Sequence, residues 1–411
     1  MLWKIHNKYY DLTKYLDLHP GGRKHLEYSN GIDATAAFES CHTFSNMSRI
    51  KSIMQKYEIN EENIKFKDVI PSTKYTFSEK GFYHELQTEV RVHMKKRNKK
   101  WTYSWLFLLL MIFSIFCFTF IYAFLGTQQL FIYRFIASII SGTSLVMTLL
   151  QGLHDASHFA ISNSKTINRV VSCFLSGLGL WDWSTWIKHH CIYHHSFTGD
   201  YNLDPDMRHT HPFFKKHYKS QANLINNPSY ISLVMSLFPG MYFGQCLAYI
   251  VAQIRGKLWG LRINFVKTKV ELVIYIVQVL AMIYGGSIIL VSSFIISLNI
   301  VYSIAILPDH DQLETRLNGK DTVTDWGEIQ VRHAGNFANL NIIYTRLNGS
   351  MNYQIEHHLF PTLNSYHLPE ISKIVKKLCK KYDIKYTHNP SIVDAYLSVI
   401  ENFALINNNE K

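Results

Sequence analysis

The 411-residue sequence is poor in charge and in cysteine, and both shortages exclude classes of protein. Charged residues make up 18% of the chain, against about 25% in ordinary soluble domains. The six cysteines show no paired spacing, which argues against a disulfide framework or a CxxC metal site and favours a reducing, cytosol-facing environment. The first residues, "MLWKIHNKYYDLTKYL", lack a continuous apolar core, so we expect no signal peptide there.

Nucleic-acid binding is also not expected, although the net charge is +12. The basic residues flank apolar runs: "HMKKRNKKW" (93–101) stands directly before one, and "KIVKKLCKKYDIK" (373–385) lies in the C-terminal tail. No nucleic-acid motif is present, and no aromatic platform is interleaved with the charges. Basic residues in such places are typical of cytoplasmic anchors beside membrane spans.

Long apolar runs are what the sequence has instead of charge. Four of them are expected to cross a membrane as two hairpins with uncharged turns: 101–125, 130–150, 270–285 and 287–307. The lysines and arginine of 95–100 place the open ends of the hairpins in the cytosol. Arg134, the single charge of the second run, is expected to reach toward the membrane interface. Residues 230–253 are interrupted by Pro239 and Gly240, so we expect an interfacial or re-entrant segment.

The remaining chain divides around these runs. Residues 1–60 are predicted to form a small α+β module. Residues 61–100 are predicted to be a linker followed by a solvated connecting helix with an amphipathic pattern, at about 78–96. Residues 101–411 are predicted to form an all-α membrane domain with both chain termini in the cytosol.

Two histidines of the N-terminal module have the surroundings of haem ligands. His19 lies in "HPGG" and His42 in "AFESCHTFS", 42 − 19 = 23 residues apart. The glycine pair lets the backbone turn tightly beside a flat ligand, and two neutral imidazoles can bind a haem iron from opposite faces. A lone histidine would be a surface or capping residue, but the pairing with HPGG favours haem.

These segments, "YYDLTKYLDLHPGG" and "DATAAFESCHTFSNMSRIKSI", resemble the cytochrome b5 family over roughly residues 3–57. The resemblance implies haem b with His19 and His42 as its axial ligands.

Three further histidine segments lie at the cytosolic ends of the predicted spans. Each repeats helical spacing, which brings side chains to one face about one turn apart. They are "HDASH" with His154 and His158, "HHCIYHH" with His190, His194 and His195, and "QIEHH" with Gln354, His357 and His358. His195 would point about 100° away from His194 on an α-helix and so toward a second ion.

The metal is not selected by these ligands alone, because imidazole suits zinc, copper, iron and nickel. A single HxxxH is also a weak signal with a real chance of being incidental. Three segments with the same placement favour a metal centre. The haem module favours iron, since a haem electron carrier can supply a site that activates oxygen.

The three segments resemble those of the membrane fatty acid desaturases, in the branch fused to cytochrome b5 and called front-end. "HHSFTGDYNLDPDMR", "TDWGEIQV" and "LNGSMNYQIEHHLFPTL" agree with it as well. The resemblance implies a di-iron centre with these ligands: His154, His158, His190, His194, His195, His310, Gln354, His357 and His358. His310 of "LPDHDQ" takes the place of a ligand after the last span, with His333 of "QVRHAGNF" as its competitor.

Other polar residues near the segments are expected to support the ligands. Asp155, Glu356 and His333 are candidates for orienting ligand histidines by hydrogen bonds, and Asp204 and Asp206 for the same task or for shaping the loop. The remaining histidines of the region are expected not to bind metal: His189, His209, His211 and His217. The aromatic stretch "WDWSTW" (181–186) is expected either to line a substrate tunnel or to form an interfacial belt.

The resemblance implies an O2-dependent acyl desaturase that uses electrons from NADH, passed through cytochrome b5 reductase to the haem. It implies a cis double bond placed between the carboxyl end and an existing double bond of a polyunsaturated acyl-CoA or phospholipid chain. "HDASH" favours Δ5 or Δ4 chemistry over Δ6. The implied location is the endoplasmic reticulum membrane with a cytosolic active site. The alternatives are a sphingolipid long-chain-base Δ8 desaturase, a fatty acyl hydroxylase and a membrane-anchored haem electron carrier.

Overall fold

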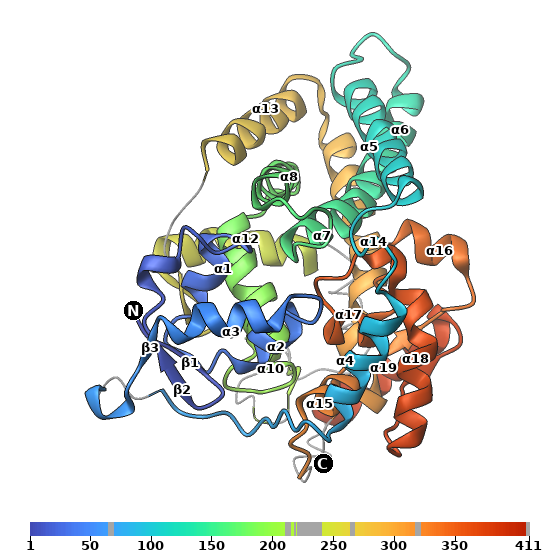
Figure 1. The fold of residues 1–411 in the computed structure, drawn as a ribbon. Coiled ribbons are helices and arrows are strands. Elements are labelled where there is room, and N and C mark those ends of the chain that lie inside the picture. Colours follow the sequence, from blue (N-terminus) through green and yellow to red (C-terminus); the bar gives the residue numbers. More distant parts are fainter. Residues whose placement is uncertain are drawn as a thin grey trace.

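The computed structural model describes residues 1–64, 70–209, 215–217, 219, 241–263, 268–316 and 322–407. The first 60 residues form the predicted α+β module, drawn in blue in Figure 1. Its elements are β1 (Trp3–Ile5), β2 (Lys8–Tyr10), a 3-10 turn η1 (Thr13–Tyr15), α1 (Arg23–Tyr28), α2 (Thr35–Cys41), α3 (Met47–Gln55) and β3 (Glu58–Ile59).

The sheet of this module is antiparallel, in the order β1-β2-β3. His6 and Asn7 join β1 to β2 with φ angles of 50° and 62°, the left-handed conformation that a tight two-residue hairpin requires. Trp3 is fully buried beneath the sheet, where its indole nitrogen donates to the carbonyl of Leu26 at 2.8 Å. The sheet and helices thus close a small core of their own.

Three helices are long and apolar enough to cross a membrane, judged by length and composition within the described residues: α5 (Tyr103–Phe124), the helix running from Phe131 to Ser157, and α14 (Ile288–Asp311). The middle one consists of α6 (Phe131–Thr148), a π-helical turn η4 (Leu149–Leu153) and α7 (His154–Ser157). The remaining expected span appears as α13 (Lys269–Gly285), a 17-residue helix that falls short of this length. Three of the four expected spans are therefore confirmed by length and composition.

The long helices pack closely at one end of the molecule, and α5 and α6 rise together at the top of Figure 1. A side chain at Gly142 of α6 would lie 2.3 Å from the carbonyl oxygen of Phe294 in α14, so this crossing requires glycine. Large apolar side chains of α5 remain exposed, including Phe107 and Phe118 at about 70%. Such an apolar face is suited to lipid.

Arg134 is buried among the helix ends. Its guanidinium donates to the carbonyl oxygen of Ala123 at 2.9 Å and to that of Gly285. These carbonyls belong to the last turns of α5 and α13, where backbone acceptors lack helical partners. The Arg134 side chain therefore connects α6 to the ends of α5 and α13. The apolar pattern of the sequence did not indicate this contact.

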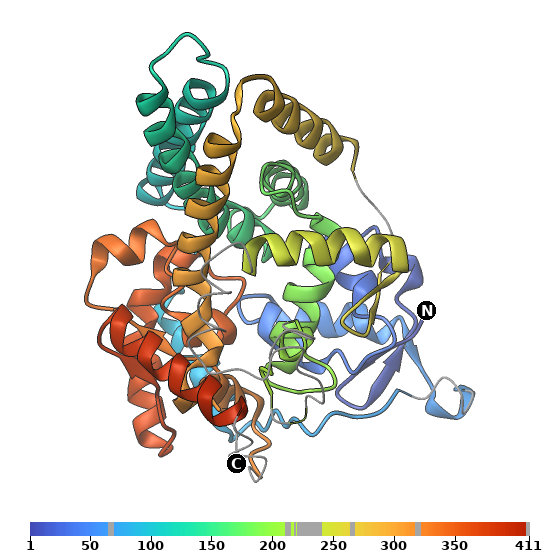
Figure 2. The same cartoon turned by 180° about the vertical axis from the view of Figure 1, so that it is seen from behind.

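The rest of the chain is mostly helical and surrounds the inner end of α14, which Figure 2 shows descending from the α5–α6 hairpin toward the C-terminal helices. These elements are η2 (Glu61–Asn63), α4 (Phe82–His93), α8 (Lys165–Leu178), α9 (Trp183–Trp186), the π-helix η5 (Ile187–His194), α10 (His195–Phe197), η6 (Pro205–Met207), α12 (Met241–Arg255), β4 (Lys257–Leu258), β5 (Leu261–Arg262), η8 (Leu313–Thr315), α15 (Trp326–His333), β6 (Asn336–Phe337), α16 (Ile342–Leu347), α17 (Gln354–Leu359), η9 (Ser365–His367), α18 (Leu368–Lys381), β7 (His388–Asn389) and α19 (Ile392–Asn407).

One expectation changes here, and a second is only partly covered by the described residues. The helix predicted at about 78–96 exists as α4, but it is not a solvated connector: Leu86 and Val90 are fully buried in one core with Trp326 of α15 and Ile371 of α18. Of the segment 230–253, residues 230–240 lie outside the described residues, and 241–253 belong to α12.

Candidate metal centre

The three histidine segments meet at the inner end of the long helices, on elements with unusual local structure. His154 begins α7, directly after the π-helical turn of the second long helix, and His158 follows the last residue of α7. His190 and His194 lie within the π-helix η5, and His195 begins α10. Single π-helical turns are frequent at functional sites, because they redirect side chains from regular helical spacing.

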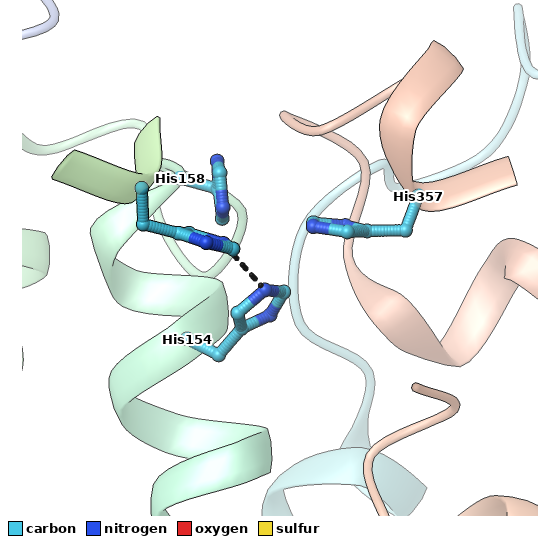
Figure 3. A group of neighbouring side chains, drawn as sticks. His154, His158 and His357 are labelled. Carbon is cyan, nitrogen blue, oxygen red and sulfur yellow. Dashed lines mark hydrogen bonds between the residues drawn. The ribbon is translucent and has the colours of Figure 1, made fainter. Parts of the chain in front are cut away.

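Four of these histidines form one buried group: His154, His158, His190 and His357 offer nitrogens that all lie within 4.8 Å of one another. The Nε2 atoms of His154 and His190 are 3.2 Å apart. Figure 3 shows His154 and His158, from one helical segment, and His357, from α17, pointing toward a common space. This is the spacing of donor atoms that can bind one ion.

A second group lies next to the first and consists of His194, His310 and His358, again with nitrogens within 4.8 Å of one another. The Nε2 atoms of His194 and His310 are 3.2 Å apart. The side-chain amide nitrogen of Gln354 lies 3.0 Å from Nε2 of His310. The structure thus brings His310, and not the ring of His333, into this group.

His195 lies between the groups. Its Nε2 atom is 3.0 Å from Nε2 of His357 and 3.3 Å from Nε2 of His190, and its ring stacks on His358 with centroids 4.2 Å apart. Its donor nitrogen therefore faces the first group. His194 and His195 thus face different groups, as expected. His190, however, shares its group with His195 and not with His194, because residues five apart share a face in a π-helix.

In the second group, hydrogen bonds from the Nδ1 atoms, which point away from the group, fix the orientation of the histidine rings. Nδ1 of His194 donates to the Asp204 carboxylate at 3.1 Å, Nδ1 of His310 to the carbonyl oxygen of His333 at 2.7 Å, and Nδ1 of His358 to the side-chain oxygen of Gln330 at 2.9 Å. Each bond places the proton on Nδ1 and leaves the Nε2 lone pair facing the group. Asp204 is among the supporting residues expected from the sequence, whereas Gln330 is not, because no spacing rule connects it to His358.

The donor set fits a metal ion. Nε2 of His358 and Oε1 of Gln354 are buried and have no hydrogen-bond partner within the described part of the chain, a costly state for polar atoms unless a ligand binds them. Burial and neighbouring histidines hold the pKa of His190, His195, His357 and His358 well below its usual range. These four imidazoles are therefore neutral, as metal ligands must be.

Asp155 and Glu356 make their hydrogen bonds to groups other than the ligand rings, although Oδ1 of Asp155 lies 3.8 Å from Nδ1 of His154. Asp155 accepts from the Asn364 amide and the Ser365 hydroxyl, both at 2.8 Å, and so ties the first histidine segment to the turn after the third. Glu356 accepts from Asn336 and from Tyr386 at 2.8 Å. Burial raises the pKa of Glu356 to about 7. Both carboxylates position backbone segments of the centre.

The other histidines of the region lie outside the two groups, as far as the described residues extend. His189 bonds to Tyr249 at 2.8 Å and to Asp206 at 2.5 Å. His209 faces Asp206 at 3.5 Å, and His217 stacks on Tyr201. His211 lies outside the described residues.

The aromatic stretch 181–186 is buried beside the centre. Trp186 stacks flat on His190, with centroids 4.1 Å apart and planes 9° apart. Trp181 packs on Tyr242 within the core. An interfacial belt would leave these rings at the surface, so the buried positions favour a wall of the site.

In the N-terminal module, His19 and His42 face each other with ring centroids 6.2 Å apart. Nδ1 of His19 donates to the Gly22 carbonyl at 3.3 Å and Nδ1 of His42 to the Phe38 carbonyl at 2.8 Å, so both Nε2 lone pairs are free for a ligand between the rings. Burial and the nearby His42 lower the pKa of His19 to about 4. A side chain at Gly21 would lie 2.7 Å from the His19 ring, which explains the glycine. The pair fits a haem iron.

Fold and sites together define a membrane protein with a haem-binding module joined to a histidine-rich metal centre. Residues 134–390 match the model of the fatty acid desaturase family, and residues 1–61 match the cytochrome b5-like haem/steroid binding domain. The chain belongs to the fatty acid desaturase family and carries a fused cytochrome b5-like domain. It is an oxidoreductase, and the resemblance seen in the sequence is confirmed.

The chain is similar to known desaturases over nearly its whole length. The chain is 24% identical to the probable Delta(5) fatty acid desaturase C of Dictyostelium discoideum, over 98% of this chain and 90% of that protein. It is also 24% identical to an acyl-lipid (8-3)-desaturase of Mortierella alpina, over 98% and 93%. An acyl-lipid (8-3)-desaturase B of Dictyostelium discoideum is 26% identical over 97% and 90%.

Proposed function

We propose that this desaturase places a cis double bond between the carboxyl end and an existing double bond of a polyunsaturated acyl chain, with Δ5 or Δ4 selectivity favoured over Δ6. The observation that carries the proposal is the pair of adjacent histidine groups in a protein with its own haem module. The names of the similar desaturases, Delta(5) and (8-3), support the position of the bond. They give no support to the sphingolipid alternative.

We propose that the two groups hold two iron ions. The first ion would be bound by His154, His158, His190, His195 and His357, and the second by His194, His310, His358 and Gln354. Once bound, iron would use O2 and electrons to remove two hydrogens from neighbouring methylenes of the chain. Burial holds the rings of His190, His195, His357 and His358 neutral, and Asp204, the His333 carbonyl and Gln330 fix the direction of the second-group rings. The buried Trp186 wall excludes water from the first group.

The haem module supports the remaining cofactor assignments. We propose haem b between His19 and His42, with electrons that come from NADH through a cytochrome b5 reductase. The domain boundaries proposed are 1–60, 61–100 and 101–411, with α4 as the part of the second region that packs on the C-terminal core. We propose four spans, with α13 as the shortest, in the endoplasmic reticulum membrane with both termini cytosolic.

Expression in a host that lacks polyunsaturated lipids tests this function. The host is fed a panel of C18–C22 fatty acids, and double bonds are mapped in the products, separately for the acyl-CoA and phospholipid fractions. A new bond on the carboxyl side of an existing one is expected, at Δ5 or Δ4. A bond on the methyl side, a hydroxylated product or a desaturated long-chain base would contradict the proposal.

A further inference from the structure

Helix α1 of the haem module lies against the turn that carries His158. Nε2 of His25 donates to the carbonyl oxygen of Ser157 at 2.9 Å, and the His25 ring meets Phe159 edge-on with centroids 5.3 Å apart. Ser157 and Phe159 are the two neighbours of His158 in the chain. One histidine of the haem module thus contacts both sides of a ligand position in the metal centre.

The same turn also reaches the haem-ligand loop. A side chain at Gly22 would lie 3.9 Å from the tip of the Phe159 ring, so the ring rests on Gly22. The Gly22 carbonyl accepts the hydrogen bond of His19. Phe159 has a φ of 60°, an unusual conformation for a bulky residue, which persists only where the surroundings hold it. A path of contacts therefore runs from His19 to Gly22, from Gly22 to Phe159, and along the chain from Phe159 to His158.

Further contacts hold the haem module from several sides. The buried hydroxyls of Tyr28 and Ser184 are hydrogen-bonded to each other. Lys165 donates to the Asp17 carbonyl at 2.7 Å. On another face, Gln87 of α4 donates to the Thr43 hydroxyl at 3.2 Å. The module is therefore fixed against the desaturase domain by side-chain contacts on more than one face.

We infer that His25 is a positioning residue, which locks the haem-ligand loop onto the first histidine segment for electron delivery within one chain. The inference rests on the proposed function. In each delivery, a ferrous haem held by His19 and His42 would give one electron to a ferric ion held by the first histidine group, so that the haem would become ferric and the ion ferrous. Two deliveries, drawn from NADH through the reductase, serve each turnover. A tethered electron carrier must diffuse until it meets the metal centre. A fixed contact makes this diffusion unnecessary and keeps the haem site and the metal centre in one relative orientation.

The test uses the full chain with three substitutions. His25→Ala removes the contact, and Tyr28→Phe removes only the buried hydroxyl on the same helix. His25→Gln keeps a side-chain N–H that can donate to Ser157 and serves as the conservative rescue. The matched control is Arg23→Gln, because Arg23 is exposed on the same helix and pairs with Asp17 inside the module at 2.8 Å.

The first readout needs no iron. In protein prepared with haem but without added iron, the haem spectrum should stay unchanged in all variants. Amide hydrogen exchange of residues 157–160 and of α1 should quicken in His25→Ala and Tyr28→Phe but not in Arg23→Gln. Unchanged exchange in both interface variants would overturn the inference.

The second readout is the reoxidation of prereduced haem in the iron-loaded chain, with O2 and an acyl substrate. His25→Ala should slow it by a factor of about ten or more, and His25→Gln should restore most of the rate. An unchanged rate in both His25→Ala and Tyr28→Phe would overturn this inference but leave the proposed function standing. If reoxidation in the unaltered chain shows no dependence on added iron, the proposed function fails instead.

Discussion

The two histidine sites of this chain are built in different ways. The haem site is local: His19 and His42 are 42 − 19 = 23 residues apart, and each ring is held by a backbone carbonyl of its own module. The metal centre is collected from distant segments, since His154 and His358 are 358 − 154 = 204 residues apart. Its rings are held by side chains from further elements, such as Asp204 and Gln330.

The difference shows how each site depends on the fold. A site held by neighbouring backbone forms whenever its small module folds. A site held by side chains from several helices forms only when α7, η5, α14 and α17 are all in place. The two sites should therefore respond independently to substitution, and the haem signal should report on folding when the centre is lost.

The largest expected effect is that of His358→Ala. It removes a ring of the second group whose Nε2 has no other partner among the described residues, so desaturation should be abolished and non-haem iron reduced. The haem spectrum should not change. Product analysis, iron analysis and visible spectra on the same preparation provide the measurement.

The control is His333→Ala. His333 supports His310 through its backbone carbonyl and not through its ring, so this variant should keep its iron. Loss of iron in His333→Ala together with retention in His310→Ala would reverse the assignment of the ligand.

The reverse experiment is His19→Ala. Removing one axial ligand should erase the haem spectrum while non-haem iron stays near its normal content, because the centre draws no ligand from the module. Desaturation should stop in a host without free cytochrome b5. Simultaneous loss of haem and iron would show that the two sites form as one unit and would contradict their independence.

A smaller effect is expected for Asp204→Asn. The carboxylate that orients His194 is lost while the shape of the side chain is kept, so iron affinity or activity should fall roughly 10- to 100-fold. Asp200→Asn is the matched control, because Asp200 in the same loop accepts from the backbone amides of Asn202 and Leu203. Equal effects of both substitutions would mean that Asp204 only shapes the loop.

The same contrast explains what the sequence predicted. The haem pair and the three histidine segments were found because their spacing is local and periodic. Gln330 and the contact of His25 with Ser157 were not found, since packing between distant elements sets them. The shared face expected for His190 and His194 was wrong, because in the π-helix His190 meets His195 instead.

The membrane part and α4 show a second kind of limit. Length and apolar composition identified the long helices, but they did not show that Arg134 would meet two helix ends. The amphipathic pattern at about 78–96 correctly predicted a helix, which is α4. Such a pattern does not say what covers its apolar face, which is the C-terminal core around Trp326 and Ile371.

The central claim is that one chain holds a haem and a separate two-iron centre, and a metal count tests it most directly. Purified protein, expressed with iron and haem precursor, is analysed for total iron and for haem in the same sample. The account predicts one haem and two additional iron ions per chain. Haem alone, with no further iron per chain, would contradict it.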